Sequence, residues 1–159
     1  MIHETTNILA LSRIYGEFPA IFVTLMRDAR WNEFLGAIWL MNNSRASEMV
    51  AENPDVLHMR SGIGETPLHY LAVENHLDGV KWLYEKGSSI NTKNEFGTPV
   101  VFEVALLGYK DLLLWLLDHD VDLRATDEDG NDVFSYLKEH EEIEILDFLQ
   151  GHTRGLNSE

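Results

Sequence analysis

The chain contains no cysteine, which excludes disulfide bonds, thiolate metal ligands and thiol nucleophiles together. It begins with Met-Ile-His-Glu instead of a basic leader, and its apolar run over residues 19–26 is too short to cross a bilayer. From these absences we expect a cytoplasmic protein with no membrane partner.

Basic residues are scarce, since the chain has 12 Lys and Arg but 27 Asp and Glu. Its net charge is therefore −15. Residues 1–60 hold 7 acids and 5 bases, whereas residues 61–159 hold 20 acids and 7 bases. Such a field repels phosphates, so we expect no direct nucleic-acid partner. It also speeds encounter with a basic protein, although an acidic surface that serves solubility alone is the alternative.

Catalytic and metal-binding patterns are missing or incomplete. Neither a glycine-rich phosphate loop nor a Gly-x-Ser-x-Gly elbow occurs. Residues 127–132 look like part of a calcium loop, but that register puts Tyr136 where a bidentate Glu is required. His119 lies between carboxylates at 118–122, which we interpret as a solvated loop at a helix end. We therefore expect no enzyme activity, no cofactor and no metal.

Three glycines, Gly64, Gly97 and Gly130, recur at a constant interval along the chain. The same shift superposes Ala72 on Ala105, Trp82 on Trp115 and Leu83 on Leu116. A period of this length indicates a repeat architecture, in which each unit must stack on a neighbour to bury its apolar face.

The first unit opens with Gly64-Glu65-Thr66-Pro67-Leu68-His69, and this opening resembles the ankyrin repeat. Glycine permits a turn with positive φ, the Thr hydroxyl can cap a helix, and Pro suits the first helical turn. The resemblance implies an all-α ankyrin-like solenoid of about four stacked helix-turn-helix units. It also implies that His69 ties neighbouring loops together by hydrogen bonds.

The later units depart from this pattern. In the second, Thr98-Pro99 arrives one position early and Phe102 stands where the first unit has His69. Either the loop is remodelled by one residue or the helix cap is lost. The third unit, from Gly130, lacks the motif and carries many carboxylates, which is typical of a terminal cap that faces water.

We predict a single domain over residues 1–159. Residues 1–30 form a divergent cap of two helices, and residues 31–63 form a degenerate first repeat. The remaining boundaries are a repeat at 64–96, a repeat at 97–129, a capping repeat at 130–150 and a frayed tail at 151–159.

The resemblance also implies a concave binding surface, formed by turn tips and the outward positions of each first helix. Its apolar members suit an interface centre and its carboxylates suit a charged rim, with Phe96 as the best single anchor. Leu106 and Leu107 have the alternative of packing between units. Carried over by register, the surface comprises Ile63, Glu65, Val73, Glu74, Glu95, Phe96, Thr98, Leu106, Leu107, Glu128, Asp129, Asn131, Glu139 and His140.

These observations lead us to expect a non-catalytic protein-binding module, monomeric on its own. Because no second domain follows the repeats, we expect it to act by masking its partner. A small acidic inhibitor of a basic protein, of the immunity-protein or antitoxin type, is the leading hypothesis. The alternative is an assembly adaptor with two separable binding surfaces, and an enzyme with an unrecognised site ranks third.

Overall fold

The computed structural model describes residues 29–154, which form an all-α solenoid with one isolated bridge between Lys93 and Pro99. Within this range, four helix pairs follow one another along the chain. Their bounds are α3 (Ala29–Trp39), α4 (Asn43–Glu52), a 3-10 helix (Pro54–His58), α5 (Pro67–Val73), α6 (Leu77–Glu85), α7 (Val100–Leu106), α8 (Lys110–Leu117), α9 (Val133–Glu139) and α10 (Ile143–Arg154). Within these residues, no helix is both long and apolar enough to span a membrane.

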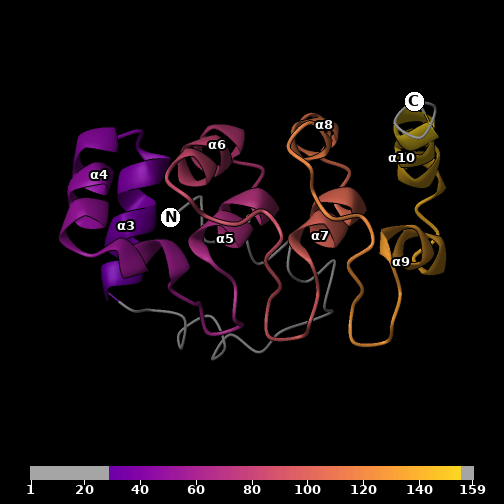
Figure 1. Ribbon diagram of the computed structural model, residues 1–159, viewed down its shortest axis with the longest axis horizontal. Coiled ribbons are helices and arrows are strands. Elements are labelled where there is room, and N and C mark those ends of the chain that lie inside the picture. Colours follow the sequence, from indigo (N-terminus) through magenta and orange to yellow (C-terminus); the bar gives the residue numbers. More distant parts are fainter. Residues whose placement is uncertain (1–28, 155–159) are drawn as a thin grey trace.

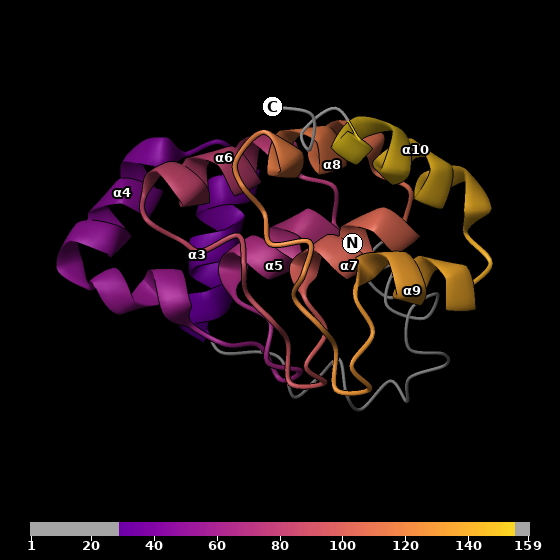
Figure 2. The ribbon, with the colours of Figure 1, turned by 45° about the vertical axis from the view of Figure 1, so that its right-hand side comes forward.

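The helix pairs stack in two rows (Figure 1). Helices α5, α7 and α9 lie side by side in one row, and α6, α8 and α10 form the second. The loops that precede α5, α7 and α9 project together from the same side of the stack (Figure 2). We call residues 60–66, 93–99 and 126–132 the finger loops.

The helix boundaries repeat with the period of the glycines. Helices α5, α7 and α9 begin at residues 67, 100 and 133, and α6, α8 and α10 begin at residues 77, 110 and 143. The register predicted from the sequence is therefore maintained through the second unit. Of the two explanations for its early Thr98-Pro99, loss of the cap is correct.

Capping differs between the units for a simple chemical reason. The Thr66 hydroxyl accepts a hydrogen bond from the backbone N–H of His69, and the Asp132 carboxylate does the same for Ser135. Pro99 occupies the corresponding position before α7 and provides no side-chain cap. Helix α7 is instead held by packing, since all seven of its residues are buried.

Each finger loop is built around one polar side chain that closes its own turn. Ser61, Asn94 and Asp127 occupy equivalent positions of successive units, and each accepts hydrogen bonds from the backbone N–H groups two and four positions later. The Asp127 carboxylate, in the segment that looked like part of a calcium loop, thus closes a turn of the repeat. Short polar side chains favour such turns because they replace backbone partners.

Basic side chains connect consecutive finger loops. The Arg60 guanidinium donates to the backbone oxygen of Lys93 at 2.6 Å, and the Lys93 ammonium donates to that of Thr126 at 2.6 Å. A backbone hydrogen bond from Glu95 N to Ile63 O, 3.0 Å long, adds to this connection. The loops therefore form a coupled row.

The aromatic side chains of Trp82 and Trp115, which the repeat superposes, pack between units. The Trp82 ring lies 6.3 Å from that of Phe34, and the Trp115 ring lies 5.4 Å from that of Tyr84. Trp31 is buried, whereas Trp39 is only half-buried.

The two predicted end segments differ in how much of them the structure describes. The predicted cap helices lie almost wholly in residues 1–28, outside the described residues. At the other end α10 continues to Arg154, so the helix extends into the segment predicted as a frayed tail. Its last turns are held by the buried Leu149 and by a Thr153 hydroxyl that donates to Leu149 O at 3.0 Å.

We predict that Gly64→Ala destabilises the protein by about 2 kcal/mol or more, and Gly130→Ala by only about 1 kcal/mol. Both glycines have positive φ, +75° and +83°, which costs any L residue. A Cβ on Gly64 would also lie 2.5 Å from the backbone nitrogen of Glu95, whereas one on Gly130 meets no atom within 4 Å. Urea unfolding of both variants measures the difference, and equal losses would contradict the close approach.

Candidate functional site

The structure divides the predicted binding residues into an exposed and a buried set. Leu107 and Asn131 are half-buried. The exposed members are Glu95, Phe96, Glu128, Asp129, Glu139 and His140. The buried members are Ile63, Glu65, Val73, Glu74, Thr98 and Leu106. The expectation that the buried six present their side chains at the surface is therefore wrong.

Burial of the apolar members has a physical cause in the stack. The next finger loop lies against the backbone of Ile63, since Glu95 N donates to its carbonyl oxygen, and the Ile63 side chain is only 1% exposed. Leu106 belongs to the central core cluster, as the alternative of packing between units predicted. Of the expected apolar centre, Phe96 alone is exposed, with 37% of its surface accessible.

The exposed residues at the ends of two neighbouring loops form what we call the finger-tip surface, comprising Glu95, Phe96, Glu128 and Asp129. The two tips adjoin each other, since a Cβ built on Gly97 would lie 2.5 Å from Cγ of Glu128. The Phe96 backbone N–H donates to Oδ1 of Asn94 at 3.0 Å, which fixes the loop that carries the ring. One aromatic group and three carboxylates are thus carried on two adjoining turns.

Glu139 and His140 belong less clearly to this surface. The Glu139 carboxylate accepts from the amide of Asn131 at 3.3 Å, so it lies near the third loop. The His140 ring contacts its own helix α9, with Nδ1 2.8 Å from Tyr136 O and the two rings 4.3 Å apart. His140 is therefore already engaged within its own helix.

A second feature lies beneath the loops, where three polar side chains are completely buried. His69 Nε2 lies 2.5 Å from Oε2 of Glu103, and the Glu65 carboxylate completes the group. We call Glu65, His69 and Glu103 the buried polar cluster. His69 thus contacts the following unit, as the resemblance implied, but its partner is a carboxylate on α7 and not a neighbouring loop.

Burial shifts the pKa of every member of this cluster away from the charged form. It raises the pKa of Glu65 to about 8, although the hydrogen bond from Ser61 opposes the shift, and it raises the pKa of Glu103 well above its usual value. Burial, aided by the nearby Arg60 charge, lowers the pKa of His69 to about 3. A buried charge is costly here unless it is compensated.

Glu103 was not predicted from the sequence as a member of this cluster, although the repeat register marks it as unusual. The equivalent positions in the units before and after it hold Tyr70 and Tyr136, so this unit has a carboxylate where its neighbours have a phenol. In the register of the glycines, the residue that corresponds to His69 is Phe102 and not Glu103. Only the packing of α5 against α7 brings Glu103 to His69.

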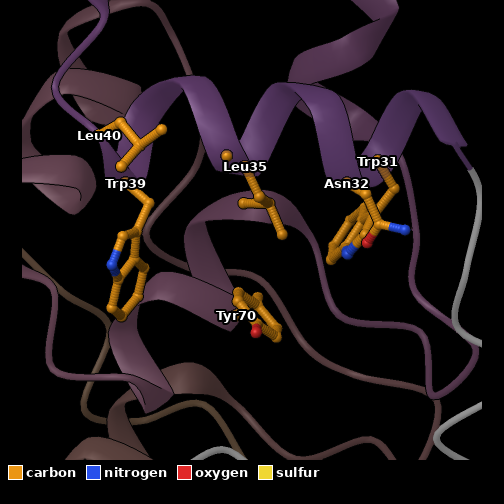
Figure 3. Close-up of a pocket in the computed structure, with 7 residues that line it drawn as sticks. Trp31, Asn32, Leu35, Trp39, Leu40 and Tyr70 are labelled. Atoms are coloured by element: carbon orange, nitrogen blue, oxygen red, sulfur yellow. The ribbon is translucent and has the colours of Figure 1, made fainter. Parts of the chain in front are cut away.

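An apolar groove lies at the other end of the stack, between α3 and α5 (Figure 3). Trp31, Leu35 and Trp39 descend from successive turns of α3 toward Tyr70. The Trp31 and Tyr70 rings are 5.9 Å apart and meet edge to face. Leu40, which is 79% exposed, extends the apolar surface beyond the groove.

Comparison with known proteins connects this architecture to a repeat family. Residues 68–108 match the family model of ankyrin repeats in many copies. An ankyrin repeat protein of variola virus, OPG189, is 31% identical over 109 residues, covering 69% of this chain and 19% of the viral protein. A putative ankyrin repeat protein of Rickettsia bellii is 27% identical over 112 residues, covering 69% of this chain and 62% of the relative. This chain therefore spans about a fifth of the length of the viral relative.

Glu74, at the end of α5, allows a test of how burial affects a carboxylate in the stack. Both of its carboxylate oxygens are buried without a hydrogen-bond partner, and burial raises its pKa to about 7. Between pH 4.5 and 7 the unfolded chain ionises at this residue while the folded protein keeps the proton, so stability is lost as pH rises. We predict that the free energy of unfolding of wild type falls by about 1–2 kcal/mol relative to that of Glu74→Gln over this pH range.

Urea titrations of both proteins at pH 5 and pH 7.5 measure this loss. Glu85→Gln, on an exposed position of α6, is the matched control and should follow wild type at both values. Parallel pH dependence of wild type and Glu74→Gln would contradict the prediction.

Proposed function

Because this chain belongs to the ankyrin-repeat family, a family of generally non-catalytic protein-interaction modules, we propose that it binds a basic protein through its finger-tip surface and masks it. The observation that carries this proposal is the exposed Phe96 ring on one finger tip, next to Glu95 in the chain and on a loop that adjoins the one carrying Glu128 and Asp129. An aromatic anchor with a charged rim is how protein interfaces are commonly organised.

Charge favours a basic partner at this surface. Residues 61–159 carry 20 acids against 7 bases, so the stack has a negative field over its repeats. Of the bases in the finger loops, Arg60 and Lys93 already donate to backbone oxygens of adjacent loops. Complementary charge raises the association rate and discriminates against acidic partners.

The order of the loop suits a binding role. Asn94 accepts from the backbone N–H groups of both Phe96 and Thr98, so the loop loses little conformational freedom when a partner docks. An inhibitor benefits from such preorganisation, because it must hold its target tightly with one modest surface. We therefore retain inhibition of a basic protein, of the immunity or antitoxin type, as the proposed action.

Selection of displayed random peptides against the full chain tests the partner chemistry and does not require that the partner be identified first. We expect the selected peptides to combine Lys or Arg with an apolar residue. Phe96→Ala should weaken their binding at least tenfold, in line with about 1.4 kcal/mol or more for an anchor residue. The triple variant Glu95→Gln, Glu128→Gln and Asp129→Asn should weaken binding and flatten its salt dependence.

A charge-matched control separates the finger-tip surface from the overall acidity. The triple variant Glu85→Gln, Asp111→Asn and Asp147→Asn removes three exposed acids from α6, α8 and α10 and should bind as wild type does. Peptides without basic residues, or equal losses in both triple variants, would refute the proposal. Far-UV circular dichroism of each variant checks that folding is intact.

The second candidate function is an adaptor that joins two proteins, and the α3–α5 groove favours it. The groove is lined by α3 and by Tyr70 of α5, whereas the finger-tip surface lies on the loops before α7 and α9, so two partners could bind together. If the chain is an adaptor, Leu40→Ser should weaken the binding of one partner, and Phe96→Ala should leave the binding of that same partner unchanged. If every partner found competes for the finger-tip surface, the adaptor function is excluded.

A further inference from the structure

The buried polar cluster has the composition of a metal site. Glu65 and His69 flank the start of α5, Glu103 comes from α7, and one ligand atom of each lies within 4.8 Å of the other two. All three side chains are 0% exposed. Among the described residues, no other group of three such side chains is gathered in this way.

The cluster is not something that repeat packing requires. Each member departs from what the equivalent positions of the other units hold: Thr98 and Asn131 for Glu65, Phe102 and Ser135 for His69, and Tyr70 and Tyr136 for Glu103. These neighbouring units stack without any carboxylate or imidazole at these places. The convergence of two acids and a histidine at one buried point therefore calls for a separate explanation.

Hydrogen bonds around the cluster hold two carboxylates while leaving ligand atoms available. The Ser61 hydroxyl donates to Oε2 of Glu65 at 3.3 Å, and the Asn94 amide donates to Oε1 of Glu103 at 2.9 Å. Oε1 of Glu65 is buried without any hydrogen-bond partner and is available to an ion. Outer groups that orient ligating carboxylates are a regular feature of metal centres.

We propose that Glu65, His69 and Glu103 bind a divalent transition-metal ion, for which Zn²⁺ is the best match. Zinc accepts imidazole nitrogen together with carboxylate oxygen, whereas Ca²⁺ and Mg²⁺ require more oxygen ligands. Two carboxylates neutralise the two charges of the ion. The like charge of Arg60, which donates to Gly64 O and Lys93 O nearby, opposes binding in part.

Metal binding displaces two protons to solvent, the one between His69 Nε2 and Glu103 Oε2 and the one that the buried Glu65 carboxyl holds below its pKa of about 8. The His69 and Glu103 groups must then move apart by on the order of 1 Å, to the separation of two ligands on one zinc ion. The ion would join α5 to α7 across the boundary between two units. Because the unfolded chain has no such site, the ion would stabilise the folded stack.

Titration of the chelator-treated full chain with ZnCl₂ tests this proposal, with isothermal calorimetry for affinity and Tm for stability. We expect one zinc per chain, a Tm that rises with zinc concentration, and no such rise with MgCl₂. Glu65→Gln and His69→Gln should weaken zinc binding at least tenfold, and Ser61→Ala should weaken it about 10- to 100-fold. Glu85→Gln, exposed on α6, should bind as wild type does.

The exposed His58, His140 and His152 could also bind zinc at the surface. Equal affinity in wild type, Glu65→Gln and His69→Gln would assign the zinc to such positions and overturn the proposal. Absence of binding or of a Tm rise in wild type would overturn it as well. If His69→Gln fails to fold, the zinc affinities of Glu65→Gln and Ser61→Ala test the proposal. None of these outcomes depends on the finger-tip surface.

Discussion

The contact between one finger loop and the next is the constraint on which the whole stack depends. Glycine at positions 64 and 97 lets the following loop approach, and the Arg60 and Lys93 side chains reach one unit forward to a backbone oxygen. Short helices such as α5 and α7 have little stability of their own. Their orientation therefore comes from packing and from this row of loops, which also fixes where Phe96 is displayed.

The finger tip and the buried polar cluster are physically connected through Asn94. Its Oδ1 closes the turn that carries Phe96, while its amide nitrogen donates to Glu103. A change in the protonation or ligation of Glu103 thus bears directly on the loop proposed to bind the partner. The two proposals remain separable, because one concerns exposed residues and the other buried ones.

Much of the fold could be predicted because the repeat is local. The constant interval between the glycines predicted the equal spacing of α5, α7 and α9, and the superposed Trp82 and Trp115 both pack against aromatic rings of the preceding unit. The binding surface was harder to predict, since a helix position described as outward says nothing of what covers it. Ile63 illustrates the difficulty: it lies on the turn as predicted, but its side chain is buried.

The sequence by itself determined the period, the helix pairs, the positive-φ glycines and the acidity of the repeats, because each depends on neighbouring residues or on composition. Only the tertiary structure decided which side chains remain exposed and which meet in the interior. Glu65 and Glu103 belong to different units and come together only when α5 packs against α7. Such a meeting is set by stacking geometry, and no local pattern specifies it.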